Sequence, residues 1–414
     1  MSFFRPEDPA VGTGASLLRD RGFRRFWLGQ AASVLGDRLL FIALPLFVFA
    51  LTRSALQVGI TVALMVAPTL AAPFLGSFVD RWDRRRTMLA ANLFQAAVVL
   101  GILAVRTTAQ LPMLWAIVFL YMLAATCFYL ARKTSVPLLV APEKLQAANG
   151  LLQVGDTFGQ LAGPSLGGIV YAWRGIGAAA VLDAAGFLLA VSAIAATRLA
   201  VGDPPPATSG RSLWADLGEA VLFLRRSALL SWAVALWGMG IFGLGPLQVL
   251  LVVLVEKALR LPPVAFGYLL SVQGAGMLLG AAMTASVLRR IPLTRQVTAF
   301  FFVAAVSYLV LANGRSFGGV AVPMAFLGMA IAVAMVAETT LTQLAVPDRL
   351  RGRIAGVTTL VTSAGSMTSM AAAGWLADRF GARLLLDGGA AVILVGAFLA
   401  AAFFLPLRVP GQEG

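Results

Sequence analysis

The sequence contains no histidine and a single cysteine, Cys127. The lack of histidine excludes histidine-based catalysis and HExxH zinc sites, and one cysteine excludes an intrachain disulfide and a multi-cysteine metal site. No GxxxxGK[ST] phosphate-binding motif occurs, so the chain has no ATPase site of that kind. No nucleophile–base pair or metal-ligand cluster is visible, so we expect neither an enzyme nor a bound metal or cofactor. A proton carrier inside a membrane would then have to be a carboxylate.

Charged residues are also scarce. They make up 12% of the 414 residues, whereas hydrophobic residues make up 59%. A soluble domain is about 25% charged, so lipid is the expected solvent for most of this chain. The net charge of +14 does not indicate nucleic-acid binding, because the basic residues are spread over short loops. Residues 1–22 lack an apolar core and are expected to be a cytoplasmic tail rather than a cleaved signal peptide.

The long apolar runs predict an all-α integral membrane protein with twelve transmembrane helices, each about 20 residues or longer. Most of the 32 lysines and arginines fall in segments that are cytoplasmic if both termini are cytoplasmic, and the inner (plasma) membrane is the expected location. We expect an N-terminal tail (1–23), a six-helix bundle (24–198), a cytoplasmic linker (199–226), a second six-helix bundle (227–405) and a C-terminal tail (406–414). The expected spans are 24–51, 56–80, 88–105, 110–132, 148–172, 177–198, 227–254, 264–288, 297–313, 318–342, 354–377 and 384–405.

The linker has two parts. GDPPPATSGR cannot continue a helix. SLWADLGEAVLFLRR places Leu213, Leu217, Val221 and Leu224 on one face, which predicts a short helix on the inner membrane surface. The alternative is a simple cytosolic hinge.

The two halves resemble each other. VAPEKLQAANG at 140–150 is similar to AVPDRLRGRIAG at 345–356, and the segment ending at Asp183 is similar to the one ending at Asp387. A weak repeat in a twelve-span protein is typical of a transporter built from two pseudo-symmetric halves. Asp183 and Asp387 lie near the outer starts of spans six and twelve, where we expect them to stabilise helix N-termini.

A charged turn, GSFVDRWDRRRTM, separates spans two and three. It resembles the signature of the major facilitator superfamily, which has a Gly, then Asp-Arg, then a basic cluster. The match falls on Gly76, Asp80, Arg81, Arg84 and Arg85, although the family usually has Gly where this chain has Asp83. The segments FRRFWLGQAASVLGDR, PEKLQAANG and VPDRLRGRIAG resemble the branch that contains the enterobactin exporter and macrolide efflux proteins. The resemblance implies the major facilitator fold, and we expect a monomer.

The same turn is a candidate gate. Gly76 would let two helices approach closely, and Asp80 would be held by neighbouring arginines or a helix N-terminus. The family resemblance implies that the start of span eleven, marked by Arg351 and Arg353, is the partner in a latch that closes the cytoplasmic side. Alternatively, the arginine cluster only sets topology.

Span five contains GQLAGPSLGG, whose matching residues are Gly159, Gly163, Pro164, Gly167 and Gly168. Its spacing resembles a motif of proton-coupled drug exporters and favours export over uptake, although helix packing alone would also explain small residues. Drug antiporters often carry an Arg within span four. Here that span is uncharged until Arg132 at its cytoplasmic end.

Ionisable residues inside spans are functional candidates by default. Asp37, Asp156 and Glu338 are the candidates for proton coupling, and a structural tie between spans is the alternative for Asp37 and its neighbour Arg38. Glu338 is expected to pair with Arg132 or Lys133 when the inner gate is closed and to take a proton as it opens. The candidates for lining a substrate cavity are Gln30, Arg38, Phe41, Trp237 and Gln248.

These features together predict a secondary exporter that moves an amphipathic small molecule, such as a drug or siderophore, in exchange for protons. It would alternate between inward-open and outward-open states around a midplane cavity. A proton-coupled uptake symporter, or a membrane receptor or scaffold that transports nothing, is the alternative.

Overall fold

The computed structural model describes residues 14–79, 82–136, 139–197, 213–407 and 409. Every regular element in these ranges is helical, which confirms the all-α prediction. The first half contains α1 (Gly14–Arg19), α2 (Arg21–Thr52), α3 (Ala55–Val66), α4 (Ala72–Val79), α5 (Arg84–Leu100), α6 (Leu111–Ser135) and α7 (Leu145–Ala196). After α8 (Leu213–Arg226), the second half contains α9 (Ala228–Val253), α10 (Val264–Ser286), α11 (Leu293–Ala312), α12 (Phe317–Ala345), α13 (Asp348–Phe380) and α14 (Ala382–Leu399).

Nine helices in the described part of the chain are long and apolar enough to cross a membrane. This number is consistent with twelve spans for three reasons. The 52-residue α7 covers the fifth and sixth expected spans. The second span is divided into α3, a 3₁₀ turn over Ala67–Ala71 and α4, with Pro68 at the break. The eleventh span, α13, is long enough but carries more polar side chains.

The two halves repeat the same unusual backbone conformations. Arg53, after α2, has a φ of 55°, and Arg260, after α9, has a φ of 54°. Gly175, inside α7, has a φ of 71°, and Gly381, between α13 and α14, has a φ of 87°. These turns join the first and second, and the fifth and sixth, helices of each half. Glycine suits the second pair because it has no Cβ to oppose a positive φ. The repeat seen in the sequence is therefore also a repeat of structure.

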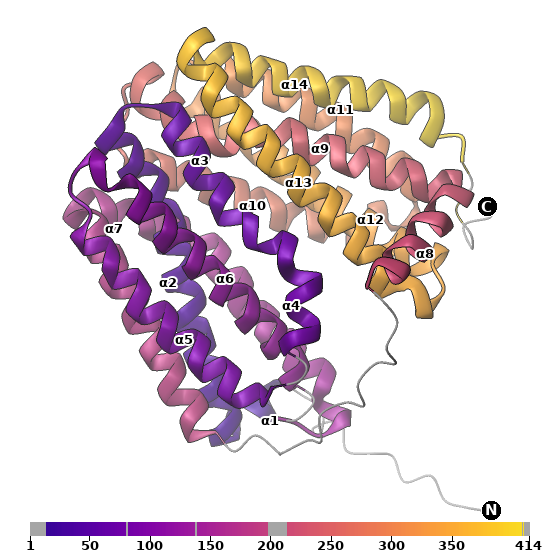
Figure 1. Cartoon of the computed structure of the whole chain (residues 1–414). Helices are drawn as coiled ribbons and strands as arrows, with labels where there is room; N and C mark the ends of the chain where they lie inside the picture. Colours follow the sequence, from indigo (N-terminus) through magenta and orange to yellow (C-terminus); the bar gives the residue numbers. More distant parts are fainter. Residues whose placement is uncertain (1–13, 80–81, 137–138, 198–212, 408, 410–414) are drawn as a thin grey trace, which may run out of the picture.

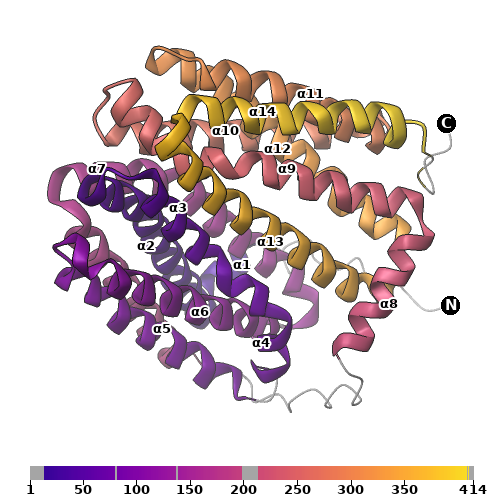
Figure 2. The same cartoon turned by 45° about the horizontal axis from the view of Figure 1, so that its top comes forward.

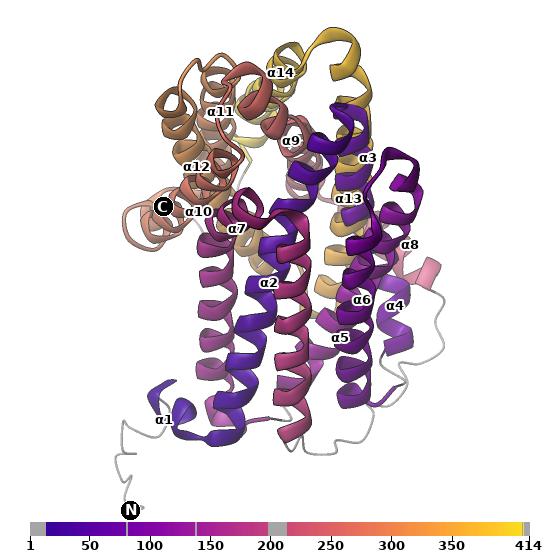
Figure 3. The same ribbon diagram turned by 90° about the vertical axis from the view of Figure 1, so that its left-hand side faces the viewer.

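The halves form two bundles that meet at one end and diverge toward the end that carries α1, α4 and α8 (Figures 1 and 2). In the first bundle α2 packs along α7, and across the halves α3 packs against α13 and α7 against α10. Figure 3 shows α1 at the diverging end of the first bundle and the turn within α7 at its other end. One hydrophobic core runs through both bundles, and a smaller cluster that includes Phe23, Phe26 and Leu152 lies near α1.

The linker is described only from Leu213 onward. Residues 213–226 form α8, where the sequence predicted a short helix, and its placement on the membrane surface stays a prediction. Residues 199–212 lie outside the described part of the chain. The boundaries of the two halves likewise stay predictions.

Candidate transport cavity

A cavity of about 570 Å³ lies between the two halves. Its wall includes Arg38 and Phe41 from α2, Gln160 from α7, Gln248 from α9 and Gln273 from α10. Ligand pockets commonly have volumes of about 300–1,000 Å³ and are mostly apolar with a few polar groups. This cavity has the same character, because methionine, leucine and valine side chains make up much of the remaining wall.

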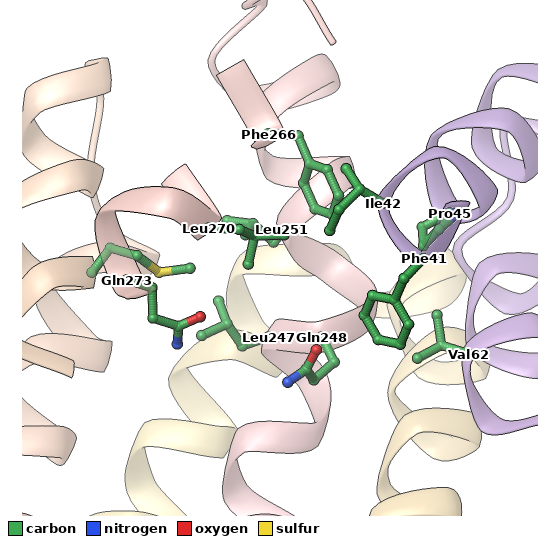
Figure 4. A pocket seen from close by; sticks show the side chains of 11 residues that line it. Phe41, Ile42, Pro45, Val62, Leu247, Gln248, Leu251, Phe266, Leu270 and Gln273 are labelled. Carbon is green, nitrogen blue, oxygen red and sulfur yellow. The ribbon is translucent and has the colours of Figure 1, made fainter. Parts of the chain in front are cut away.

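The far end of this space is narrow. Phe41, Gln248 and Gln273 also line a smaller pocket whose other walls include Pro45, Leu251 and Phe266. Figure 4 shows the Phe41 ring and the two glutamine amides directed into the same space. Two of the predicted cavity residues, Phe41 and Gln248, are therefore brought together by α2 and α9.

A second compartment of about 460 Å³ lies within the first half and adjoins the first, because Arg38, Phe41, Gln153 and Gln160 line both. Asp37 and Asp156 face it, as do Tyr121 and Arg132 of α6. The structure thus brings two of the predicted proton-coupling carboxylates to one space.

Asp156 is ion-paired. Arg132 Nη1 and Nη2 donate to its two carboxylate oxygens at 3.2 and 2.8 Å, in a bidentate arrangement. The two side chains are 12% and 25% exposed, so the pair is largely shielded from water. Arg38 differs, because in the described part of the chain it has no hydrogen-bond or ion-pair partner, although it lines both compartments. Its guanidinium is a cation directed at the space where a ligand would lie.

Asp37 forms a cluster that the sequence did not predict. The Tyr121 hydroxyl contacts Asp37 Oδ1 and also lies 2.8 Å from Asp183 Oδ2. Asp183 is fully buried in α7, well past the turn at Gly175. The prediction that Asp183 stabilises a helix N-terminus is therefore wrong, because it lies beyond the first turn of that helical segment. Its counterpart Asp387 also lies beyond the first turn of α14, and it accepts a hydrogen bond from Asn313 Nδ2 at 2.9 Å.

The small residues of span five are packing positions. A Cβ placed on Gly159 would lie 2.6 Å from Val34 Cγ1, and one on Gly163 would lie 2.3 Å from Arg38 Cβ. A Cβ on Gly167 would lie 2.8 Å from Leu39 O, and one on Gly168 would lie 3.2 Å from Gly267 Cα. Pro164 lies inside α7, and a Cβ on Gly267 would lie 2.3 Å from its carbonyl oxygen. The motif thus holds α7 against α2 and α10, and it sets the position of Arg38.

The predicted gate lies only partly within the described part of the chain. Asp80 and Arg81 lie outside the described residues. No described atom lies within 4 Å of a Cβ placed on Gly76, so its predicted close approach is absent here. The close approach occurs instead at the repeat-related Gly280, where a Cβ would lie 2.3 Å from Met329 O. Asp83, where the family usually has Gly, caps α5 by accepting from Arg86 N at 2.7 Å.

The basic residues of the gate make several contacts with described groups. Arg353 is ion-paired with Glu219 of α8. Arg351 donates to the Gln343 and Val346 carbonyl oxygens, at 2.6 and 3.1 Å. Arg85 donates to Ala195 O at 2.6 Å, and Arg84 begins α5. The two bundles diverge on the side that carries α1 and α8 (Figures 1 and 2).

Three predicted residues lie away from the cavity. Gln30 is buried in α2 and lines neither compartment, so its assignment to the cavity stays a prediction. Trp237 packs against the main core and also lines neither compartment, so its assignment stays a prediction as well. Glu338 is half-buried and accepts from Thr342 Oγ1 at 3.4 Å, and Lys133 is exposed. Their pairing in a closed state stays a prediction.

The opposite side is closed by polar contacts between the halves. The Asp378 carboxylate, just beyond the expected eleventh span, accepts from Ser54 Oγ at 2.5 Å, Ala55 N at 2.9 Å and Leu56 N at 3.0 Å. Burial acts to raise the pKa of Asp378, but these hydrogen bonds and the Lys257 ammonium outweigh it and lower the pKa below its ordinary value. A Cβ on Gly374 would lie 2.6 Å from Ala55 O, so α3 and α13 meet backbone to backbone.

Comparison with known proteins agrees with this architecture. The family model described as Major Facilitator Superfamily matches residues 26–370. The uncharacterized MFS-type transporter YfiS of Bacillus subtilis (strain 168) is 28% identical over 400 residues, covering 91% of this chain and 92% of the relative. Macrolide efflux protein A of Streptococcus pyogenes is 24% identical, covering 88% and 92%. Enterobactin exporter EntS of Salmonella typhimurium (strain LT2) is 26% identical, covering 87% of each.

Solved structures have the same fold. The nucleoside transporter NupG superposes with a TM-score of 0.78 at 12% identity, covering 94% of this chain and all of that one. A bacterial homologue of the iron transporter ferroportin, in its inward-facing state, superposes with a TM-score of 0.71 at 16% identity, covering 93% and 98%. The family match, the two helical bundles and the cavity between them lead to one conclusion: the chain belongs to the major facilitator superfamily and is a membrane transporter rather than an enzyme.

Proposed function

We propose that this transporter exports an amphipathic small molecule, such as a macrolide-like drug or a siderophore, from the cytoplasm in exchange for protons. The observation that carries the proposal is the composition of the interhalf cavity. Arg38 supplies a cation that has no hydrogen-bond or ion-pair partner among the described residues, the glutamines supply amide groups, and the remaining wall is largely apolar. Such a wall suits a ligand that has both an apolar body and anionic or hydrogen-bonding groups. Two relatives over most of the chain are named as a macrolide efflux protein and an enterobactin exporter.

With the N-terminus in the cytoplasm, the state described above is inward-facing. Cargo would enter the cavity from the cytoplasm, and rocking of the two halves would then expose it to the other side. In the outward-facing state, Asp80 would take Arg351 or Arg353 as its partner.

Transport in inverted membrane vesicles tests the proposal. The lumen of such a vesicle corresponds to the cell exterior, so an acidified lumen should drive accumulation of a macrolide or an iron chelator by exchange for protons. An uptake symporter would instead move the same compound out of the vesicle. If no compound in a panel of macrolides and iron chelators moved, or if movement ignored the proton gradient, the export proposal would be refuted.

Arg38 gives a residue-level test of the cargo class. Arg38→Gln removes the cation from the cavity and is expected to weaken binding of an anionic chelator roughly tenfold or more, with a smaller effect on an uncharged compound. Arg38→Lys keeps the charge and should recover part of the affinity, although not the bidentate geometry. Arg315→Gln, in the exposed loop between α11 and α12, is the control. Equal losses for charged and uncharged compounds would contradict the assigned role of Arg38.

A further inference from the structure

The hydroxyl of Tyr121 lies between two carboxyl groups, those of Asp37 and Asp183. A phenol has one proton and can donate to only one of them. Its second contact is a hydrogen bond only if a protonated carboxyl donates to the phenolic oxygen. Two ionised carboxylates would leave one carboxylate oxygen facing the lone pairs of Tyr121. The three groups therefore hold one more proton than the tyrosine alone supplies.

The surroundings place this proton on Asp183. Its side chain is 0% exposed, and its Oδ1 atom has no hydrogen-bond partner in the described part of the chain. No lysine or arginine in that part of the chain donates to it, and a buried carboxylate without a cation is costly. Asp37 instead faces the compartment that contains Arg38 and Arg132, which favour its ionised form.

The other groups around this cluster do not supply the missing charge. Asp156 of α7 is paired with Arg132 of α6, Tyr129 of α6 is a second phenol at the compartment wall, and α5 contributes only the neutral Gln95. The close approach of α7 to α2 depends on a glycine. A Cβ on Gly36 would lie 2.7 Å from Asp183 Oδ1 and 2.9 Å from Asp183 Cα.

We propose that Asp183, Tyr121 and Asp37 form a proton-holding site, in which Asp183 stores one proton and Tyr121 relays it to Asp37 at the cavity wall. In the relay, Asp183 Oδ2 gives its proton to Tyr121 Oη while the hydroxyl proton of Tyr121 moves to Asp37 Oδ1. Tyr121 is unchanged, Asp183 becomes ionised and Asp37 becomes neutral, so one proton has moved toward the compartment. The inference rests on the proposed function, because it names the groups that would carry the coupled proton.

Infrared spectroscopy of the full chain in lipid nanodiscs tests where the proton resides. A protonated carboxyl has a C=O stretching band that a carboxylate lacks, so the difference spectrum between wild type and Asp183→Asn should contain that band. Asp37→Asn and Asp387→Asn should keep it. Asp387 is the matched control because it is repeat-related to Asp183 but accepts from an asparagine. Tyr121→Phe should move the band to higher frequency, because the carboxyl loses its acceptor, and this variant keeps the test valid if Asp183→Asn does not fold.

Transport of a radiolabelled macrolide tests the relay. The ratio of accumulation with and without a proton gradient should fall roughly tenfold or more, toward about one, in Tyr121→Phe and stay at the wild-type value in Asp387→Asn. A carboxyl band that survives Asp183→Asn, or disappears in Asp37→Asn alone, would overturn the proton assignment. An undiminished ratio in Tyr121→Phe would overturn the relay.

The two proposals can fail separately. If the band follows Asp183 but wild type moves no macrolide or chelator, the export proposal fails and the proton site stands. If wild type responds to the gradient but the band is indifferent to Asp183 and Tyr121, the site fails and the export proposal stands.

Discussion

With the termini in the cytoplasm, as proposed, the side closed by Asp378 is the outer side, and this residue offers a quantitative test of that closure. Its carboxylate accepts three hydrogen bonds from the start of α3, which belongs to the other half. Asp378→Asn keeps one carbonyl acceptor but loses the negative charge and at least one bond. A hydrogen bond to a charged group contributes about 1.5–3 kcal/mol when it is buried. Asp378 is exposed, so solvent screening reduces the expected loss to about 1.4 kcal/mol, which shifts the equilibrium toward the outward-open state by roughly tenfold.

The shift can be measured by cysteine accessibility. In a Cys127→Ser background, Leu251→Cys places a thiol at the closed end of the cavity, where Leu251 is buried. A membrane-impermeant maleimide added from outside should label it roughly tenfold faster when Asp378 is also Asn. Asp387→Asn is the control, because its partner Asn313 lies in the same half. Equal labelling rates in the two variants would refute the reasoning.

Three further predictions follow from the same contacts. Gly267→Ala should lower the melting temperature, because the new Cβ would lie 2.3 Å from the Pro164 carbonyl oxygen. Gly365→Ala should not, because nothing lies within 4 Å of a Cβ placed there. Equal melting temperatures of the two variants would contradict this prediction. Asp156→Asn should reduce vesicle transport of a macrolide, because it leaves the shielded Arg132 without its ion-pair partner. Adding Arg132→Gln should recover part of the lost transport. Equal transport by the double and single variants would count against the role of the pair. Because the pKa of Asp378 is lowered, its contribution to outer closure is present above the ordinary aspartate pKa of about 3.9 and is lost as the pH falls through the lowered value. At each pH, the ratio of the maleimide labelling rate in Asp378→Asn to that in the protein with Asp378 should therefore stay constant above about pH 5 and fall toward one in stronger acid.

The membrane fold could be predicted because the bilayer imposes local rules on sequence. Apolar runs long enough to cross the bilayer and the positions of arginines in loops can both be identified from the sequence alone. Neither requires knowledge of which helices are in contact. The repeat could also be recognised from short similar segments of the sequence. Gly175 and Gly381, which have positive φ angles, occur in the paired segments that end at Asp183 and Asp387. Arg38 was predicted for the cavity because a charge inside an apolar run has few other stable environments. Phe41 was predicted because a large apolar side chain can line a cavity for a hydrophobic compound.

The proton cluster could not be predicted in this way, because it depends on the rotation of three helices about their axes. The lack of histidine left carboxylates as the predicted proton carriers, and Tyr121 was not among the predicted residues. A signal was nevertheless present, since the chain has only five tyrosines and this one interrupts the apolar run of span four. The burial of Gln30 has the same geometric cause, since it depends on which face of α2 turns toward the neighbouring helices.

The backbone-to-backbone contact at Gly168 and Gly267 has a consequence for the energy of the transport cycle. A contact made by backbone atoms has no interlocking side chains, so the helices can separate and come together again without rotamer changes. Their separation exposes little apolar surface to water. A contact made by leucine side chains would instead cost about 25 cal/mol of free energy for each Å² of apolar surface exposed. Under the proposed function, the two conformations can then lie close in free energy, so that binding of one proton or one molecule would be enough to shift the equilibrium between them.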